Sequence, residues 1–161
     1  MSQIEKYNSL DNVQQKIRLS IMDVIIDKGS SVTLQEVIEY ISKNLKLEKE
    51  YIENTLQYFI DKNIMVVDED SINFIYPVSA LPTNHKVTLS DGRSFSAMCA
   101  IDAIGTSCTF NQDVRINSMC SVTGKEIEIF IKNEKIEYVN NPHLRVLHIN
   151  LDKYSNWAAS C

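Results

Sequence analysis

The sequence predicts an α+β fold with a helical N-terminal part and a β-rich C-terminal part. Three observations support this prediction: helical spacing of apolar residues up to residue 61, alternating β-type stretches after residue 85, and Pro77 and Pro82 bracketing the change of pattern. The chain has 161 residues, 44% of them apolar, which suffices for two compact domains. We expect these domains at residues 1–80 and 81–161.

Two amphipathic helices are predicted in the first third of the chain. Apolar residues recur at helical spacing over 13–25, and Gly29 follows as a stop. Thr33 and Glu36 form a T-x-x-E capping box, which marks the start of the second helix. The apolar face of this second helix consists of Leu34, Val37, Ile38, Ile41 and Leu45.

A third helix is predicted over 48–61, followed by strands at 64–67 and 72–76. Three helices followed by a hairpin are typical of a winged-helix domain, and many such domains bind DNA. Here the third helix and the turn of the hairpin are acidic, and residues 1–80 carry 13 acidic against 8 basic side chains. Repulsion from phosphates therefore argues against nucleic-acid binding, and a winged-helix regulator is the least favoured function.

The C-terminal part is predicted to be a sheet with one short helix at 94–104. Turns are expected at Ser90-Asp91-Gly92-Arg93, Thr123-Gly124 and Asn133-Glu134. Ile127, Ile129 and Ile131 alternate and so share one face of a strand. The predicted strands are 85–89, 114–117, 126–131, 135–139 and 144–151.

Composition excludes several classes of protein. The N-terminus is polar and mixed in charge, unlike a secretory signal, and no apolar run is long enough to cross a membrane, so we expect a cytoplasmic protein that does not bind membranes. All four cysteines, Cys99, Cys108, Cys120 and Cys161, lie in the second half without a C-x-x-C pair. A zinc ribbon and a thioredoxin motif are therefore not expected.

A cysteine and an aspartate form the one constellation that suggests chemistry. Cys99 and Asp102 are three residues apart, which on a helix turns both side chains toward the same face. A thiol and a carboxyl group can then share one site, although a buried structural cysteine beside a solvated aspartate is the alternative. His85, His143 and His148 lack the spacing of a metal site, so we interpret them as solvated or locally hydrogen-bonded imidazoles.

The motifs around this pair resemble those of the organomercurial (alkylmercury) lyase family. Residues 89–124 read L-S-D-G-R-S-F-S-A-M-C-A-I-D-A-I and, after a variable stretch, V-R-I-N-S-M-C-S-V-T-G. The matching features are the DGR turn, the C-A-x-D motif, and an S-x-C-x-x-T-G segment placed 21 residues after the first cysteine. The resemblance is strongest over 85–125 and implies an N-terminal winged-helix-like domain that has lost DNA binding.

The resemblance implies which residues act. Members of the family use two cysteines and one aspartate to cleave a carbon–mercury bond, releasing a hydrocarbon and Hg(II). By motif, Cys99 is similar to the first thiol and Asp102 to the acid, and Cys161, in the final Ser-Cys pair, is similar to the second thiol. The same three residues would hold the mercury. Cys120 matches a family cysteine with a structural role, and Cys108 has no counterpart.

The chemistry accounts for these residue types. Hg(II) is soft and prefers thiolates, and a second sulfur donor makes the bound carbon better able to accept a proton. An ordinary aspartate is ionised at neutral pH, so it must first take a proton from a thiol and then deliver it to carbon. No organic cofactor is needed, because the metal arrives with the substrate.

The implied setting is mercuric resistance by detoxification. We expect an organomercurial or other organometal compound as substrate, low-molecular-weight thiols, and a mercuric reductase or metal exporter downstream. The alternative is a non-catalytic protein that holds Hg(II) between thiolates. Replacing Asp102 by Ala separates the two functions, because a lyase would lose turnover whereas a binding protein would keep its affinity.

Two departures from the family pattern stand out. Met98 replaces the aromatic residue that is common before the first cysteine, which changes the wall of the pocket. Relatives continue beyond the position of Cys161, so we expect that the chain is truncated, is degenerate, or continues through a selenocysteine codon. A selenolate would be a softer and more acidic second donor than a thiolate.

Overall fold

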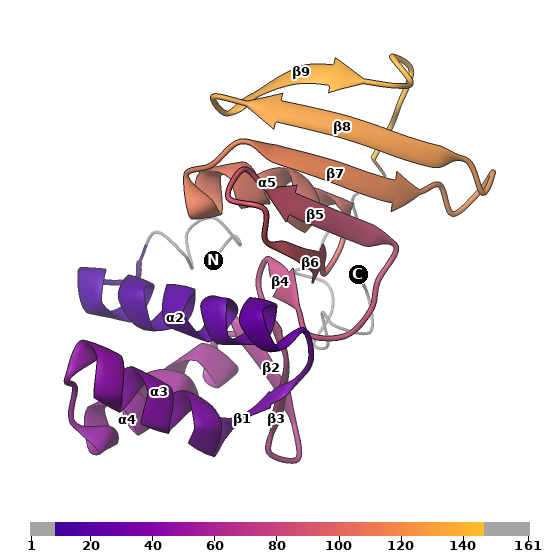
Figure 1. Cartoon of the computed structure of the whole chain (residues 1–161). Coiled ribbons are helices and arrows are strands. Elements are labelled where there is room, and N and C mark those ends of the chain that lie inside the picture. Colours follow the sequence, from indigo (N-terminus) through magenta and orange to yellow (C-terminus); the bar gives the residue numbers. More distant parts are fainter. Residues whose placement is uncertain (1–8, 147–161) are drawn as a thin grey trace. The chain divides into compact units, whose positions relative to one another are not determined.

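The computed structural model describes residues 9–146, and the chain divides into two compact units (Figure 1). The first unit ends at Ile75 and the second begins at Tyr76, a few residues before the boundary expected from the sequence. Both helices and an extended antiparallel sheet are present, so the predicted α+β class is confirmed. None of the helices in the described part of the chain is long and apolar enough to cross a membrane.

Three helices form most of the N-terminal unit: α2 (Asn12–Lys28), α3 (Leu34–Leu45) and α4 (Lys49–Asp61). Each buries one apolar face, as the helical spacing predicts. The fully buried residues among them include Ile17, Ile21, Val37, Ile41, Ile52 and Phe59.

The ends of these helices are set by local sequence. The predicted capping box of α3 is confirmed: the Glu36 N–H donates to Thr33 Oγ1 at 3.1 Å, and the Thr33 N–H donates to Glu36 Oε2 at 2.7 Å. Helix α2 begins with an equivalent box between Asp11 and Gln14. It ends at Gly29, whose φ of 69° is left-handed and free of strain for glycine.

The two strands predicted after the third helix are present in the N-terminal unit, and a third strand precedes the second helix. Strand β3 (Ser71–Ile75) pairs with both β1 (Val32–Thr33) and β2 (Met65–Asp68), always antiparallel. The sequence prediction missed β1, because two residues are too few for a periodic pattern. The hairpin β2–β3 follows the third helix, as expected for the predicted arrangement.

In the described part of the C-terminal unit, six strands form an antiparallel array in the order β4-β6-β5-β7-β8-β9. Strands β5, β7, β8 and β9 were expected from the sequence. The strands are β4 (Val78–Ser79), β5 (His85–Leu89), β6 (Ser94–Ala97), β7 (Val114–Met119), β8 (Glu126–Lys132) and β9 (Lys135–Val139).

Helix α5 (Ala100–Phe110) covers one face of this sheet (Figure 1). Val87 lies opposite Phe95 on one side and Ile116 on the other, so these side chains share a face. All three are buried, and the Phe110 ring of α5 lies 5.5 Å from the Phe95 ring, centroid to centroid. An apolar row of the sheet thereby fixes α5, which carries the candidate site.

The structure corrects the sequence prediction at residues 94–104 and at residues 144–146. Residues 94–104 are not one short helix: Ser94–Ala97 form β6, and the helix begins only at Ala100. The pairing with β5 decides this, because alternate side chains of residues 94–97 are buried as in a strand. Of the predicted strand 144–151, residues 144–146 are not in a strand, and the remainder lies outside the described residues.

Candidate active site

A thiol and a carboxyl group meet at the start of helix α5. The Cys99 Sγ–H donates a hydrogen bond to Asp102 Oδ2 at 3.2 Å, and both side chains are half-buried. Cys99 is the N-cap residue of α5, and Asp102 lies in its first turn. The structure thus brings together the two residues that the sequence pattern singled out.

The backbone on either side of Cys99 is held in place. Strand β6 ends at Ala97, and the N–H of the buried Met98 donates to the Pro77 carbonyl at 3.2 Å. Cys99 itself is extended, with φ −145° and ψ 179°, and its carbonyl accepts from the Ala103 N–H at 2.9 Å. The chain therefore changes from strand to helix around Cys99.

The reason that Cys99 and Asp102 meet differs from the one expected. The sequence analysis placed both on one face of a helix, but Cys99 precedes the helix as its N-cap. The residue at the N-cap and the third helical residue are neighbours in a capping box, as for Thr33 and Glu36 in α3. In α5 the side chain of the N-cap bonds to the side chain of Asp102 and makes no cap hydrogen bond to the backbone.

The electrostatic setting favours negative charge at this pair. The first turn of a helix presents backbone N–H groups without helical partners, which stabilise anions by a few tenths to about 1 kcal/mol. Both Cys99 and Asp102 lie at this end of α5. The proton of the Cys99–Asp102 hydrogen bond thus lies between a sulfur and a carboxylate, which is a suitable starting point for proton transfer from thiol to acid.

The far end of α5 is fastened by the predicted DGR turn. Asp91 Oδ2 accepts hydrogen bonds from Arg93 Nε at 2.9 Å and from Gln112 Nε2 at 3.0 Å. The Arg93 guanidinium, with the Gln112 amide, lowers the pKa of Asp91 to about 2. Gln112 Oε1 also accepts from Ser90 Oγ at 3.0 Å, so the residues after α5 are tied to the β5–β6 turn. The sequence predicted the turn but not its partner Gln112.

A histidine that the sequence analysis left without a role lies in the same unit. His85 Nδ1 is 2.9 Å from Ser118 Oγ, and the ring is partly buried. Burial lowers the pKa of His85. Of the two alternatives expected for the histidines, solvated or locally hydrogen-bonded, His85 is hydrogen-bonded, but to a partner 33 positions away in the sequence.

The other described cysteines are separate from the thiol–carboxyl pair. Cys120 lies in the turn after β7, where hydrogen bonds from Thr123 and from the Val122 N–H lower the pKa of its thiol. Cys108 is exposed on α5. Neither residue is in a disulfide, and neither is Cys99.

Two of the three expected mercury-binding residues, Cys99 and Asp102, are hydrogen-bonded to each other. Cys161, predicted as the second thiol, lies outside the described residues, as does His148. Within residues 9–146, no group of three or more His, Cys, Asp or Glu side chains is arranged to hold a metal ion. Cys99 and Asp102 are therefore the described residues that could contact a metal at this site.

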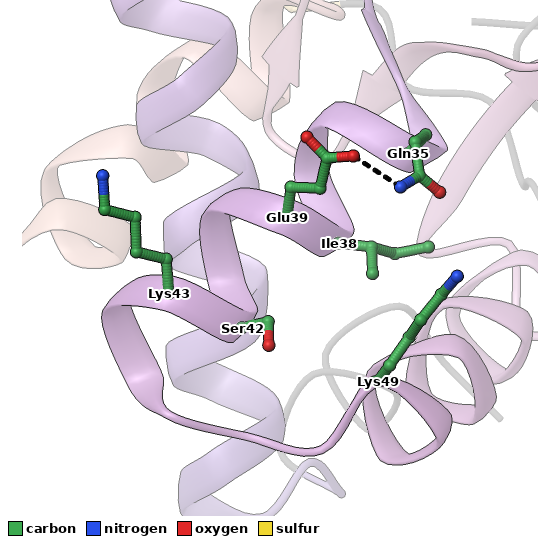
Figure 2. A pocket seen from close by; sticks show the side chains of 6 residues that line it. All are labelled: Gln35, Ile38, Glu39, Ser42, Lys43 and Lys49. Carbon is green, nitrogen blue, oxygen red and sulfur yellow. Dashed lines mark hydrogen bonds between the residues drawn. The ribbon is translucent and has the colours of Figure 1, made fainter.

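A pocket of about 340 Å³ lies in the N-terminal unit, at helices α3 and α4 (Figure 2). Its lining offers ammonium, amide, hydroxyl and carboxylate groups, and Gln35 Nε2 donates to Glu39 Oε1 at 2.6 Å on one wall. None of these is a soft donor, so the pocket does not suit Hg(II). It is lined by Gln35, Ile38, Glu39, Ser42, Lys43 and Lys49.

Comparison with solved structures supports the fold. A structure described as the mercury-bound form of MerB2 superposes with a TM-score of 0.62 at 23% sequence identity. The match covers 83% of this chain and 62% of that chain, so this chain spans less than two thirds of the other's length. No curated protein matches the sequence.

Comparison with protein families gives a more direct result. The family model described as alkylmercury lyase matches residues 78–161, which is slightly more than half of the chain. The matched range contains the whole C-A-x-D motif and the Cys99–Asp102 pair. The chain therefore belongs to the alkylmercury lyase family.

Proposed function

We propose that the protein is an organomercurial lyase that cleaves a carbon–mercury bond by protonolysis. The observation that carries this proposal is the 3.2 Å hydrogen bond from Cys99 Sγ to Asp102 Oδ2 at the start of α5. It pairs a soft metal ligand with a proton carrier, which are the two functions that the reaction requires. Membership of the alkylmercury lyase family agrees with this assignment.

The first step is capture of the substrate, R–Hg–X, by Cys99. A bond forms between Cys99 Sγ and mercury, the bond between mercury and X breaks, and X leaves with the electron pair of that bond. The proton of the Cys99 thiol passes to Asp102 Oδ2 along the existing hydrogen bond. Cys99 is then a thiolate ligand of R–Hg, and X leaves as an anion.

The second step is transfer of a proton to carbon. The protonated Asp102 donates to the carbon of R, the carbon–mercury bond breaks, and its electron pair becomes the new C–H bond. The hydrocarbon R–H leaves, Asp102 returns to the carboxylate, and Hg(II) stays on sulfur. General acid catalysis by a positioned carboxyl group accounts for about 10² to 10⁴ in rate.

A second sulfur on mercury would promote this step, because electron donation from sulfur makes the bound carbon more basic. Cys161 is our candidate for this donor, on the basis of the family resemblance of the final Ser-Cys pair. If its thiol binds mercury before this step, its proton passes to solvent, because Asp102 already holds the proton of Cys99. Cys99, Asp102 and Cys161 together would then hold the metal.

The setting that we propose is detoxification of organomercurials in the cytoplasm. Low-molecular-weight thiols would deliver the substrate and remove Hg(II), since thiol exchange at mercury replaces one sulfur ligand by another. A mercuric reductase or an exporter would act on the released metal. The reaction needs no organic cofactor, because a proton and sulfur ligands suffice.

The test uses the full chain. Purified protein is incubated with phenylmercury and excess glutathione, and benzene in the headspace is measured by gas chromatography. We expect benzene in proportion to protein and time, with one Hg(II) formed per benzene. A folded protein that binds phenylmercury but releases no benzene above the thiol-only control would refute the proposal and favour a mercury-binding protein.

A further inference from the structure

The half-buried imidazole of His85 has no part in the mechanism proposed above. His85 is the first residue of β5, and its Nδ1 lies 2.9 Å from Ser118 Oγ at the end of β7. No hydrogen bond to His85 Nε2 is present among the described residues. One ring nitrogen is therefore fixed, and the other is available for a ligand.

The sheet register places His85 beside the strand that leads into Cys99. Lys86 lies opposite Ser96, which puts His85 next to Ala97 on β6. Thr83 secures this position, because its hydroxyl donates to the Ala97 carbonyl at 2.6 Å and accepts from the His85 N–H at 3.1 Å.

His85 and Ala97, the last residue of β6 before the segment that carries the thiol, lie on the same face of the sheet. His85 is two residues before Val87 on β5, so its side chain shares the sheet face on which α5 packs. Ala97 shares that face, and Cys99 follows it by two residues with an extended backbone. Because His85 lies opposite Ala97 and two residues span at most about 7 Å, the Cα atoms of His85 and Cys99 are at most about 12 Å apart. A ligand bound to mercury on Cys99 is of a size to fill such a gap.

Release of Hg(II) from Cys99 needs a proton acceptor. A thiol such as glutathione is mostly protonated at neutral pH, while the form that attacks a metal is the thiolate. The incoming thiol must therefore lose a proton as its sulfur binds. A neutral imidazole can accept that proton, and burial, which lowers the pKa of His85, keeps its ring neutral at pH 7.

We propose that His85 Nε2 accepts the proton of the exogenous thiol that removes Hg(II) from Cys99. This inference rests on the proposed function in one respect, namely that Cys99 holds mercury. As the thiol sulfur bonds to mercury, its proton moves to His85 Nε2. The bond between mercury and Cys99 Sγ then breaks, and the Cys99 thiolate takes the proton from the imidazolium. No atom is oxidised or reduced, and His85 returns to its neutral form.

Ser118 has a defined part in this step. When His85 Nδ1–H donates to Ser118 Oγ, the lone pair remains on Nε2, which is the nitrogen that must accept the proton. Ser118 is therefore a positioning residue, and Ser118→Ala should slow the step less than loss of the ring itself.

The test measures transfer of Hg(II) rather than cleavage of carbon–mercury bonds. Protein loaded with one equivalent of HgCl₂ is mixed with glutathione at pH 7, and after timed intervals the protein is separated by rapid desalting and its mercury is measured. We expect His85→Ala to slow the transfer at least tenfold, and added imidazole to restore much of the rate. His85→Gln, which preserves bulk at the site, should be slow as well.

His143→Ala is the matched control, since His143 is an exposed histidine of the same unit. It should transfer mercury at the wild-type rate. Circular dichroism checks that each variant is folded, and if His85→Ala is not, His85→Gln decides. The inference would be overturned if the folded His85 variants transferred mercury at the wild-type rate. It would also be overturned if transfer in folded His85→Ala were slow and added imidazole did not restore it. Failure of the proposed function gives a different result. If Cys99 does not hold mercury, Cys99→Ser will retain as much Hg(II) as wild type.

Discussion

Cys99 Sγ donates a hydrogen bond to Asp102 Oδ2 across the N-terminus of α5, at 3.2 Å. The two residues occupy the N-cap and the first turn, positions that in α3 hold a threonine and a glutamate in a purely structural capping box. In α5 these two positions instead hold side chains that bond to each other and that can bind a soft metal and carry a proton.

Replacing Asp102 by Ala should separate cleavage from binding. We expect benzene release from phenylmercury to fall at least about a hundredfold, because the proton carrier is lost, while Hg(II) binding weakens much less, because thiolates are the preferred ligands of Hg(II). Headspace gas chromatography and equilibrium dialysis measure the two quantities. Glu126→Ala removes an exposed carboxylate from the same unit and should leave both unchanged. An active Asp102→Ala variant would exclude Asp102 as the acid.

Cys99, the N-cap of α5, and Cys108, within α5, provide a matched pair of variants. Cys99→Ser should abolish benzene release, since a hydroxyl is a hard donor and a poor ligand for mercury. Cys108→Ser should retain it, because Cys108 is exposed and apart from the Cys99–Asp102 pair. Both variants are assayed with phenylmercury and excess glutathione. Equal loss of activity in the two variants would contradict the assignment of Cys99.

Asp91 should give the protein a component of acid sensitivity. Its pKa in the folded state is about 2, below the ordinary value of 3.8, so the folded state binds this proton less readily than the unfolded state. The resulting stabilisation is fully present above about pH 4 and is lost as the pH falls toward 2. Its size should be roughly 1 kcal/mol or less, because the ion pair with Arg93 is partly exposed to solvent.

The measurement is urea denaturation of wild type and Asp91→Asn at several pH values. The difference in the free energy of unfolding between the two proteins should be largest near neutral pH and shrink between pH 4 and pH 2. A difference that does not change over this range would show that the charge of Asp91 does not matter for stability.

Packing of α5 on the sheet should depend on Phe95. This side chain is 8% exposed and its ring lies 5.5 Å from that of Phe110, so Phe95→Ala should lower the free energy of unfolding by about 3 to 5 kcal/mol. Tyr138→Ala, at a side chain that is 50% exposed, should change it by less than about 0.5 kcal/mol. The free energies of unfolding of the two variants are measured by chemical denaturation, with circular dichroism as the signal. Similar values for the two variants would mean that the interface of Phe95 with α5 contributes little.

The sequence by itself determined the features that depend on residues close together in the chain. Thr33 and Glu36 form their capping box, and Gly29 ends α2, because these contacts involve neighbours within one turn. Strands β5 and β9 have the predicted bounds, since alternation within five residues is a local pattern. The family motif likewise drew attention to Cys99 and Asp102 before any geometry was known.

Only the tertiary structure decided how these elements combine. Residues 94–97 are a strand and not the start of a helix because β4 and β5 pair with them, and this makes Cys99 an N-cap residue. Gln112 reaches Asp91, and Ser118 reaches His85, across 21 and 33 positions of sequence. The physical reason is that strand register and helix docking depend on burial of apolar rows contributed by distant segments, which no local pattern encodes.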